Sequence, residues 1–557
     1  MTLLSILSSP ACPPFFCLPI LRALNTIADR LPLQNQQDRP KDTRLADLLF
    51  QKEYVGCLAR ILEQDYGAHH VQASIELTAS LVGKLCTEEA HKALLADCGV
   101  LDALSAKVAS FVVAQGFVLP GAEEHVGVPG ALGALPPAAP PTAKLAPILR
   151  AVTVIIEHSK WRAEHFLSSP GVITVFPKQL PDFAPNDIKR GPWGSTYLSG
   201  SAVPRHAGAS PVEYLLPSVP SPQSKNSASA INFPPLGQST HRRRSQSFPT
   251  PFSLFDTSGL DEEENTIIPW LLYVLRAENG IVRLMAARLV TVLFRLGLAK
   301  RHRVPMLGFL LIPILIRMMD KEPDIQGACP TEYESLILAA KCLKEEAPAV
   351  LALLVIDDQE LQRYAVEGGA IKRLSQLLKE SFNPVQESTR SMWCPDGEYD
   401  DQGSDGQQIP ECKLGSSGYS AAHCHVMRYR ENILKALASL VPFKDEYRKA
   451  ICENGVVPYI IDSLKPSSSE PPAETSKPRN TAADGNPTAT LLAACGAVRM
   501  LTRSVSVLRT SLIDAGVASP LFALIKHPDI EVQIAATSVI CNLSLEFSPV
   551  REVCSSI

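Results

Sequence analysis

The sequence is poor in aromatic residues and contains none of the common catalytic motifs. Phe, Trp and Tyr make up 6% of the 557 residues, against 46% for all apolar residues, so the core must be built from Leu, Val, Ile and Ala. We find no phosphate-binding P-loop, no H-E-x-x-H, no G-x-S-x-G, no dinucleotide-binding glycine motif and no RING-like ladder of Cys and His. The composition favours packed helices. The missing motifs predict a protein that is not an enzyme and binds no cofactor.

Charge and hydropathy argue against two classes of partner. The formal net charge of −4 gives no general attraction to nucleic acid or to anionic membranes. No uninterrupted run of 18 apolar residues occurs, so we expect no membrane span. The second residue is Thr2 rather than the glycine that N-myristoylation requires.

The fourteen cysteines follow no regular pairing pattern, and none forms a C-x-x-C. The apolar start of the chain lacks the basic region of a secretion signal, so we expect reduced thiols. His423, Cys424 and His425 could be combined with Cys394 and Cys412 into a zinc site, but their spacing matches no common ligand arrangement. The sequence therefore predicts no metal site.

Proline is abundant, with 46 residues, or about 8% of the chain against roughly 5% in average proteins. Helices cannot accommodate so many prolines, because each removes a backbone donor and clashes with the preceding turn. Four stretches contain 27 of them: 117–143, 177–262, 382–422 and 466–490. We expect these stretches to be linkers or loops, because they cannot bury enough apolar surface to offset the entropy of ordering.

A glycine-centred pattern recurs in the rest of the chain. It reads LADCGVLDAL, AVEGGAIKRL, ICENGVVPYI and LIDAGVASPL, with an acidic residue two positions before the glycine, and LSSPGVITVF keeps everything except the acid. The pattern indicates one helix that ends, a glycine free to adopt a positive φ, and a second helix that begins at an angle. The predicted repeat-turn glycines are Gly99, Gly171, Gly369, Gly455 and Gly516.

The spacing of these turns predicts the type of repeat. Once the insertions are subtracted, the turns recur every 36 to 46 residues or so, close to the period of armadillo and HEAT repeats. A third helix with apolar residues at i, i+3, i+4 and i+7 precedes each pair, as at 71–86, 281–298, 430–441 and 531–547. Three helices per unit favour armadillo repeats over two-helix HEAT repeats. Helices at 264–276 and 304–319 are predicted as second helices of degenerate units, with Pro269, Pro305 and Pro313 near their starts or causing kinks.

The predicted fold is therefore all-α: an armadillo-type α-solenoid, a right-handed superhelix of three-helix repeats with long disordered insertions. The predicted organisation is a partly helical N-terminal segment at 1–40, repeats at 41–116, a Pro/Ala/Gly linker at 117–143, a repeat at 144–176, a disordered Pro/Ser-rich insertion at 177–262, repeats at 263–381, an acidic disordered loop at 382–422, a repeat at 423–465, a disordered loop at 466–490, and repeats at 491–557 that stop within a unit.

The ordered part resembles the armadillo family throughout. The helix that ends AATSVICNLSLEFSPVRE at 535–552, and the Arg-rich helix VRLMAARLVTVLFRLG at 282–297 after a long Pro/Ser insertion, resemble more specifically the armadillo subunits of GID/CTLH ubiquitin ligases. The resemblance implies a non-catalytic scaffold that connects the ligase core to a substrate receptor, for proteasomal or vacuolar degradation of metabolic enzymes. It also implies a cytoplasmic and nuclear location.

In armadillo proteins that read basic localisation signals, third helices carry a Trp and, four residues later, an Asn. The corresponding pairs here have no Trp and one Asn, which disfavours that activity. The Lys and Arg among them predict a locally basic groove for an acidic or carboxylate-bearing partner segment, although they could equally be ordinary solvated residues. The predicted groove residues are Ser80, Lys84, Thr291, Arg295, Lys435, Ser439, Ser538 and Asn542.

The longest insertion contains the motif HRRRSQSFP at 241–249. Arg242 and Arg243 precede Ser245 at the positions that basophilic kinases prefer. The stretch from Arg244 onward also fits the R-S-x-S-x-P form that 14-3-3 proteins bind when the second serine, Ser247, is phosphorylated. We predict phosphorylation of Ser245 and Ser247 and binding of 14-3-3 at phosphorylated Ser247. The alternative is an unmodified basic patch.

An armadillo adaptor in nucleocytoplasmic transport or in vacuolar membrane tethering is the alternative function. The missing Trp/Asn ladder and the missing acylatable glycine count against its two best-known forms.

Overall fold

The computed structural model describes residues 2–9, 14–30, 45–117, 135–176, 267–299, 303–320, 330–384, 421–466, 485–503 and 506–544. All of them lie in one compact unit that comprises Met1–Lys178 and Glu263–Ile557. Every named element among them is a helix, and the one β-type contact is an isolated bridge between Pro466 and Asn486. The all-α prediction is confirmed for this part of the chain. No described helix is long and apolar enough to cross a bilayer.

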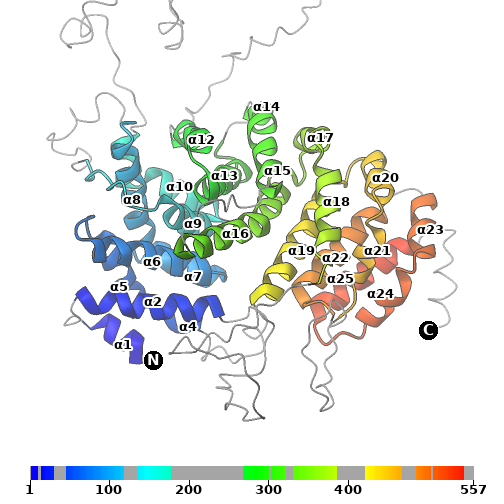
Figure 1. Cartoon of the computed structure of the whole chain (residues 1–557), viewed down its shortest axis with the longest axis horizontal. Coiled ribbons are helices and arrows are strands. Elements are labelled where there is room, and N and C mark those ends of the chain that lie inside the picture. The colour runs from blue at the N-terminus through cyan, green and yellow to red at the C-terminus, as the bar shows by residue number, and fades with distance from the viewer. Residues whose placement is uncertain are drawn as a thin grey trace, which may run out of the picture. The chain divides into compact units, whose positions relative to one another are not determined.

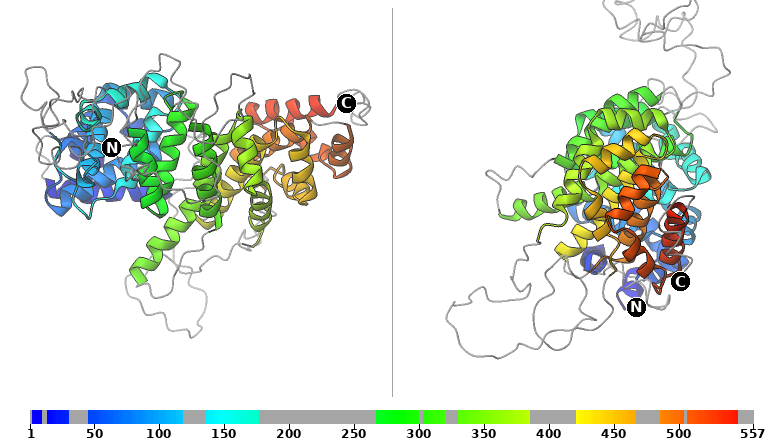
Figure 2. Two further views of the ribbon diagram at one scale, coloured as in Figure 1. Left: turned by 90° about the horizontal axis from the view of Figure 1, so that it is seen from above. Right: turned by 90° about the vertical axis from the view of Figure 1, so that its right-hand side faces the viewer.

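Eight long helices form a continuous row in which each packs against the next (Figure 1). We call these helices the third-helix row. They are α2 (Pro14–Arg30), α6 (His69–Leu85), α9 (Leu145–Ile156), α13 (Gly280–Arg295), α16 (Pro330–Val355), α19 (Ala421–Leu440), α22 (Thr488–Leu501) and α25 (Ile530–Leu543). Figure 2 shows them in two further views. The row is the structural basis of the α-solenoid, because each helix buries its apolar face only by stacking on its neighbours.

Shorter helices connect successive members of the row. First and second helices form the pairs α4 (Leu45–Leu49) and α5 (Lys52–Glu63), α7 (Glu89–Asp97) and α8 (Val100–Ala114), α10 (Lys160–Ser168) and α11 (Pro170–Val175), α17 (Gln359–Glu367) and α18 (Ala370–Glu380), α20 (Asp445–Glu453) and α21 (Val457–Asp462), and α23 (Ser506–Asp514) and α24 (Ala518–Leu524). An additional helix, α1 (Thr2–Ser8), contacts α2 and α5.

The region between Val175 and Pro330 departs from the regular pattern. Helix α12 (Ile267–Ala277) packs against α13, and a helix that runs through α14 (Val304–Met306), η5 (Leu307–Leu311) and α15 (Ile312–Asp320) packs against α16. The five residues of η5 form a π-helical turn directly before α15, whose second residue is Pro313. A proline inside a helix cannot donate to the preceding turn, and a wider π turn relieves the clash. Pro305, by contrast, occupies the first turn of α14.

Four of the five predicted turn glycines have the expected backbone conformation. Gly99, Gly369, Gly455 and Gly516 have φ values of 79°, 82°, 64° and 88°. Gly99 and Gly369 directly precede the second helices α8 and α18. A residue with a Cβ is strained in this left-handed region. These turns therefore carry the helix-turn-helix geometry that the sequence pattern indicated.

The prediction for Gly171 was wrong. Ser169, with φ −64° and ψ 148°, ends α10 and precedes α11, whose first residue is Pro170. Gly171 lies inside α11, and a Cβ on it would come within 2.7 Å of the Cα of Ala106 on α8. The turn thus lies two residues earlier than the glycine pattern suggested. At this position glycine is required by the close approach of two helices rather than by a positive φ.

In three repeats, a polar side chain seven residues before the turn ties the first helix to the row. Arg162 Nε donates to the Ile155 carbonyl at 2.6 Å, and Gln362 Nε2 donates to the Val355 carbonyl at 3.1 Å, in both cases at the end of the preceding third helix. Gln362 also donates to the Ser439 carbonyl on the following third helix. The side chain thereby satisfies helix-terminal carbonyls that lack intrahelical partners. Arg448 occupies the same position and donates to the carbonyls of Pro442 and Met500, while Lys92 and Arg509 occupy it in two further repeats.

Two predicted loop boundaries were wrong, and the predicted linker is packed at its C-terminal end. Helix α19 begins at Ala421, inside the predicted loop 382–422, and α22 begins at Thr488, inside the predicted loop 466–490. Residues 135–143 of the linker pack on the helices, where the Ala139 amide donates to the Ser110 carbonyl at 3.0 Å and the Thr142 hydroxyl donates to Gln72 Oε1. These few residues find backbone and side-chain partners that composition alone does not reveal. Residues 118–134 and 177–262 lie outside the described part.

Arg430 on α19 joins the ends of two insertions. Its Nη1 donates to Asn486 Oδ1 at 2.6 Å and its Nη2 donates to the Ser381 carbonyl at 2.7 Å, while the guanidinium lies 3.7 Å from the ring centroid of Phe382. The Asn486 side-chain amide donates in turn to the Lys465 carbonyl. Burial lowers the pKa of Arg430 to about 10, which leaves it charged at neutral pH. The side chain is 2% exposed and therefore depends on these partners.

Candidate interaction surface on the third-helix row

Two of the predicted groove residues do not reach the surface, so this part of the prediction was wrong. Thr291 on α13 is completely buried, and its hydroxyl donates to the Ala287 carbonyl one turn earlier. Ser439 on α19 is 7% exposed and donates to the Ala436 carbonyl. The alignment to the Trp/Asn ladder placed these positions on the accessible side, but in this chain they face the neighbouring helices. Neither can contact a partner.

The three predicted basic residues all have partners within the chain. Lys84 Nζ donates to Asn25 Oδ1 at 3.3 Å, and Arg295 Nη1 donates to the Ile356 carbonyl at 2.7 Å. Lys435 Nζ lies 2.5 Å from Glu431 Oε1 one turn away on α19. The Lys435 side chain is 50% exposed, whereas that of Glu431 is 19% exposed. The Lys435 ammonium can therefore contact an external carboxylate while it keeps its pair with Glu431.

The remaining predicted groove residues lie on α6 and α25. Ser80 on α6 and Ser538 on α25 are both half-buried, and the Ser538 hydroxyl donates to the Ile534 carbonyl. Asn542 reaches across to α22, where its side-chain amide donates to the Arg499 carbonyl at 3.3 Å. Ser80 on α6 lies far along the row from Ser538 and Asn542 on α25, and the last two side chains already have partners within the chain. They do not form one site.

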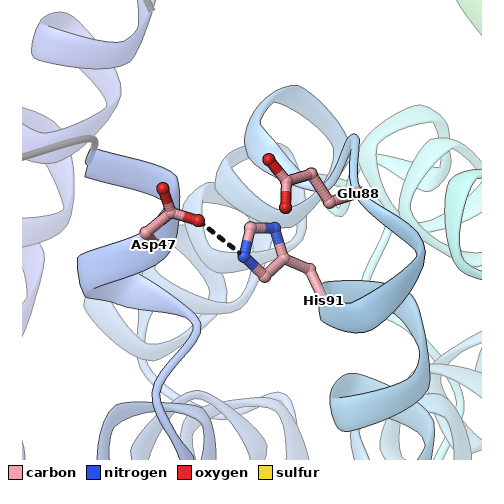
Figure 3. A group of neighbouring side chains, drawn as sticks. All are labelled: Asp47, Glu88 and His91. Atoms are coloured by element: carbon pink, nitrogen blue, oxygen red, sulfur yellow. Dashed lines mark ion pairs between the residues drawn. The ribbon is translucent and has the colours of Figure 1, made fainter. Parts of the chain in front are cut away.

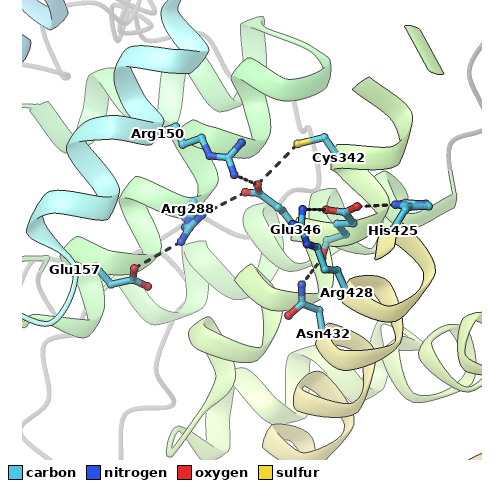
Figure 4. Close-up of polar contacts among 9 residues, drawn as sticks. Arg150, Glu157, Arg288, Cys342, Glu346, His425, Arg428 and Asn432 are labelled. Carbon is cyan, nitrogen blue, oxygen red and sulfur yellow. Dashed lines mark hydrogen bonds and ion pairs between the residues drawn. The ribbon is translucent and has the colours of Figure 1, made fainter. Parts of the chain in front are cut away.

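The main polar group on the row is centred on α16 and was not predicted. We call it the α16 polar cluster (Figure 4). Glu346 Oε1 lies 2.9 Å from Arg150 Nη2 on α9, and Glu346 Oε2 lies 3.3 Å from Arg288 Nη1 on α13. Arg288 also contacts Glu157 at 3.6 Å. The Cys342 thiol points to Glu346, and burial raises its pKa to about 12, so it remains protonated.

The second half of the α16 polar cluster joins α16 to α19. Glu345 Oε1 lies 2.7 Å from His425 Nδ1, and Glu345 Oε2 lies 4.0 Å from Arg428 Nη1. The Asn432 amide donates to the Glu345 carbonyl at 2.8 Å. His425, which the sequence offered as a disfavoured zinc ligand, is thus engaged with a carboxylate. Cys394 and Cys412 of that alternative lie outside the described residues.

The α16 polar cluster spans four successive third helices and balances three arginines against three glutamates. The row is therefore electrically mixed here rather than basic, because Glu345 and Glu346 neutralise the cations that face them. The sequence carried a signal for it: two adjacent glutamates in the largely apolar helix 330–355, one arginine within the apolar run LAPILRAVTVII and two within IVRLMAARLV. Helical periodicity alone does not pair charges that are 58 or more residues apart.

The comparisons with known proteins agree with the repeat type. No protein-family model matches the chain. It is 28% identical over 304 residues to GID complex subunit 5 of Schizosaccharomyces pombe, which covers 54% of this chain and 32% of that protein. It is 28% identical over 273 residues to Armadillo repeat-containing protein 8 of Danio rerio, covering 49% of this chain and 31% of that protein. The chain thus spans about a third of the length of these relatives.

A shorter match joins the chain to Armadillo repeat-containing protein 8 of Mus musculus, with 32% identity over 128 residues, 23% of this chain and 16% of that protein. Among solved structures, a designed armadillo repeat protein superposes with a TM-score of 0.30 at 14% identity, over 49% of this chain and 80% of its own. An engineered protein superposes with a TM-score of 0.34 at 12% identity, over 97% of this chain and 98% of its own.

Proposed function

We propose that this chain, an armadillo-repeat protein similar to GID complex subunit 5 and Armadillo repeat-containing protein 8, is a non-catalytic scaffold subunit of a GID/CTLH-type ubiquitin ligase. The observation that carries the proposal is the 304-residue match to a GID complex subunit. The absence of a catalytic motif in the sequence agrees with a scaffold. In this role the chain connects the ligase core to a substrate receptor in the cytoplasm and nucleus, and directs metabolic enzymes to proteasomal or vacuolar degradation.

The third-helix row is the surface that we assign to the partner. It runs through all the described repeats and presents exposed cations such as Lys435 and Arg428, with side chains 50% and 43% exposed. Both are held by weak ion pairs to glutamates on the row. A carboxylate-bearing partner segment can contact the exposed cations while they keep their glutamates on the row. A transport or tethering adaptor is the alternative function.

Affinity purification of the tagged chain with mass spectrometry tests both the complex and the surface. We expect recovery of LisH/CTLH and RING subunits, and about a tenfold loss of at least one ligase partner in Lys435→Glu, because the reversed charge repels a carboxylate. Lys449→Glu is the matched control, since Lys449 is also an exposed lysine paired with a glutamate one turn away, but on the first helix α20. Recovery of importins or vacuolar membrane proteins without ligase subunits would contradict the scaffold role. Equal recovery with both variants would contradict the surface.

The motif at 241–249 lies outside the described residues, and we propose it as a regulatory site. We expect a 14-3-3 protein to co-purify with the phosphorylated chain and to be lost on phosphatase treatment or in Ser247→Ala, because the partner reads the phosphate through charge-assisted hydrogen bonds. Ser253→Ala, in the same insertion, is the control and should retain binding. Phosphosite mapping that finds Ser245 and Ser247 unmodified under all nutrient conditions would rule out this regulation.

A further inference from the structure

A cavity of about 350 Å³ lies against the second helices of the first two described helix pairs. It is bounded by the end of α5, by one face of α8 and by Pro136 and Pro137 of the packed linker. Its volume is at the lower end of the range of about 300 to 1,000 Å³ for ligand sites, which suits one or two side chains. Glu63, Asp65 and Pro137 are exposed, so the cavity is open to solvent.

The lining of this cavity is acidic. Its charged residues are Glu63, Asp65, Asp102 and Lys107. Three carboxylates and one ammonium give it a formal charge of −2. The Lys107 side chain is buried, and its Nζ donates to the Gln64 carbonyl at 2.5 Å and lies 5.0 Å from the centroid of the Tyr66 ring. The only cation in the lining therefore already has partners, and the excess of negative charge favours a cationic ligand.

Other carboxylates in the first repeats contact a buried histidine instead. Figure 3 shows the His91 imidazole between Asp47 and Glu88, and His91 Nε2 lies 3.0 Å from Asp47 Oδ1. The Asp47 side chain is only 19% exposed, so this group is an internal contact between α4 and α7. Glu63 and Asp65, by contrast, are exposed and form no hydrogen bond or ion pair with any described side chain. Their carboxylates are available to a partner.

An exposed tryptophan lies next to the cavity. Trp161 on α10 is 59% exposed, and the centroid of its ring lies 5.5 Å from that of the His165 ring. His165 Nε2 in turn lies 3.4 Å from Oδ1 of Asp102, which lines the cavity. About three extended residues of a bound segment would span these two steps. Tryptophan is enriched among the residues that dominate binding energy, and the face of its ring attracts cations.

We propose that the cavity and Trp161 together bind an arginine-rich segment of another protein. One guanidinium enters the cavity and donates to the carboxylates that line it, while its apolar stem packs against Leu62 and Ala103. A second guanidinium stacks on the Trp161 ring. Arginine fits better than lysine, because its planar fork donates to two acceptors at once. The surface lies on α5, α8 and α10 rather than on the third-helix row, so it is independent of the proposed ligase role.

Fluorescence anisotropy of a labelled octapeptide of alternating arginine and glycine, titrated with the purified full-length chain, tests the proposal. We expect Glu63→Lys and Trp161→Ala each to weaken binding about tenfold or more, because the first reverses a charge in the cavity and the second removes the stacking ring. Both side chains are exposed, so both variants should fold. The matched controls are Glu446→Lys on α20 and Phe309→Ala on η5, which change an equally exposed type of side chain elsewhere and should bind like the wild type.

The remaining outcomes separate this ligand from other occupants. The corresponding lysine–glycine peptide should bind about threefold more weakly or worse, and a glutamate–glycine peptide should not bind. Equal affinity for the lysine peptide would overturn the assignment of arginine. Equal affinity of the wild type, Glu63→Lys and Trp161→Ala for the arginine peptide would overturn the site. So would a dimer in analytical ultracentrifugation that Trp161→Ala dissociates, because the surface would then bind a second copy of the chain.

Discussion

Replacing Arg430 with methionine is expected to lower the free energy of unfolding of the C-terminal repeats by about 3 to 5 kcal/mol. Methionine retains the apolar stem but leaves the Ser381 carbonyl and Asn486 Oδ1 without their donor, and both lie in buried surroundings. Lysine is not an adequate replacement, because a single ammonium group cannot reproduce the planar fork that donates to α18 and to the start of α22 at once. Arg430→Lys should therefore recover only a small part of the loss.

Hydrogen exchange with mass spectrometry is the appropriate measurement for Arg430, because repeat proteins can unfold locally rather than in one step. Exchange should accelerate in the peptides that cover α19 and α22 and remain unchanged in α6 and α9. Arg428→Met, two residues away, is the control, since the Arg428 side chain is 43% exposed and contacts Glu345 only at 4.0 Å. Similar exchange in both variants would show that the buried hydrogen bonds of Arg430 do not support this region.

Gly171→Ala is the second substitution with a large expected effect, a loss of about 3 kcal/mol or more. The added Cβ would lie 2.7 Å and 2.8 Å from the Cα and N atoms of Ala106, which are backbone atoms of α8 and cannot rotate away. The helices α8 and α11 must then separate, and the buried contacts around Val172 and Val175 open. Urea denaturation followed by circular dichroism should show a lower midpoint.

Gly496→Ala is expected to have the opposite effect on stability, although the chemical change is the same. Gly496 lies inside α22, and a Cβ there would meet nothing within 4 Å. Alanine has the higher helix propensity, so the variant should be more stable than the wild type by about 0.5 to 1 kcal/mol. The same Gly→Ala change thus lowers stability at Gly171 and raises it at Gly496, because the two glycines have different neighbours. A Gly171→Ala variant as stable as the wild type would show that the α8–α11 contact adjusts freely.

Much of the fold followed from local patterns in the sequence. The apolar period of 71–86 and 281–298 predicted α6 and α13, and the glycine pattern located the turns at Gly99 and Gly369, since a positive φ is a property of the residue itself. The pattern wrongly predicted a turn at Gly171, because this glycine allows two helices to come into close contact. Such a contact depends on Ala106, 65 positions away, and no local rule anticipates it.

The candidate site was less accessible to sequence reasoning. Thr291 and Ser439 lie on third helices but are buried, because one turn of such a helix presents both groove and core positions and the sequence pattern did not tell them apart. The α16 polar cluster depends on side chains from separate repeats. Their distances follow from how the repeats stack, which the insertions between them conceal in the sequence.

The backbone contact between Asn486 and Lys465 affects how well this chain tolerates a change in its length. The backbone amide of Asn486 donates to the Lys465 carbonyl at 2.8 Å, so the chain leaves and re-enters the described fold at adjoining points. The entropy of closing a flexible loop rises only with the logarithm of its length, and doubling that length costs about 0.6 kcal/mol. We therefore expect a change in the length of the chain between Lys465 and Asn486 to have little effect on the stacking of α21 (Val457–Asp462) against α22. The same position is suited to the insertion of a fluorescent protein or an epitope for imaging.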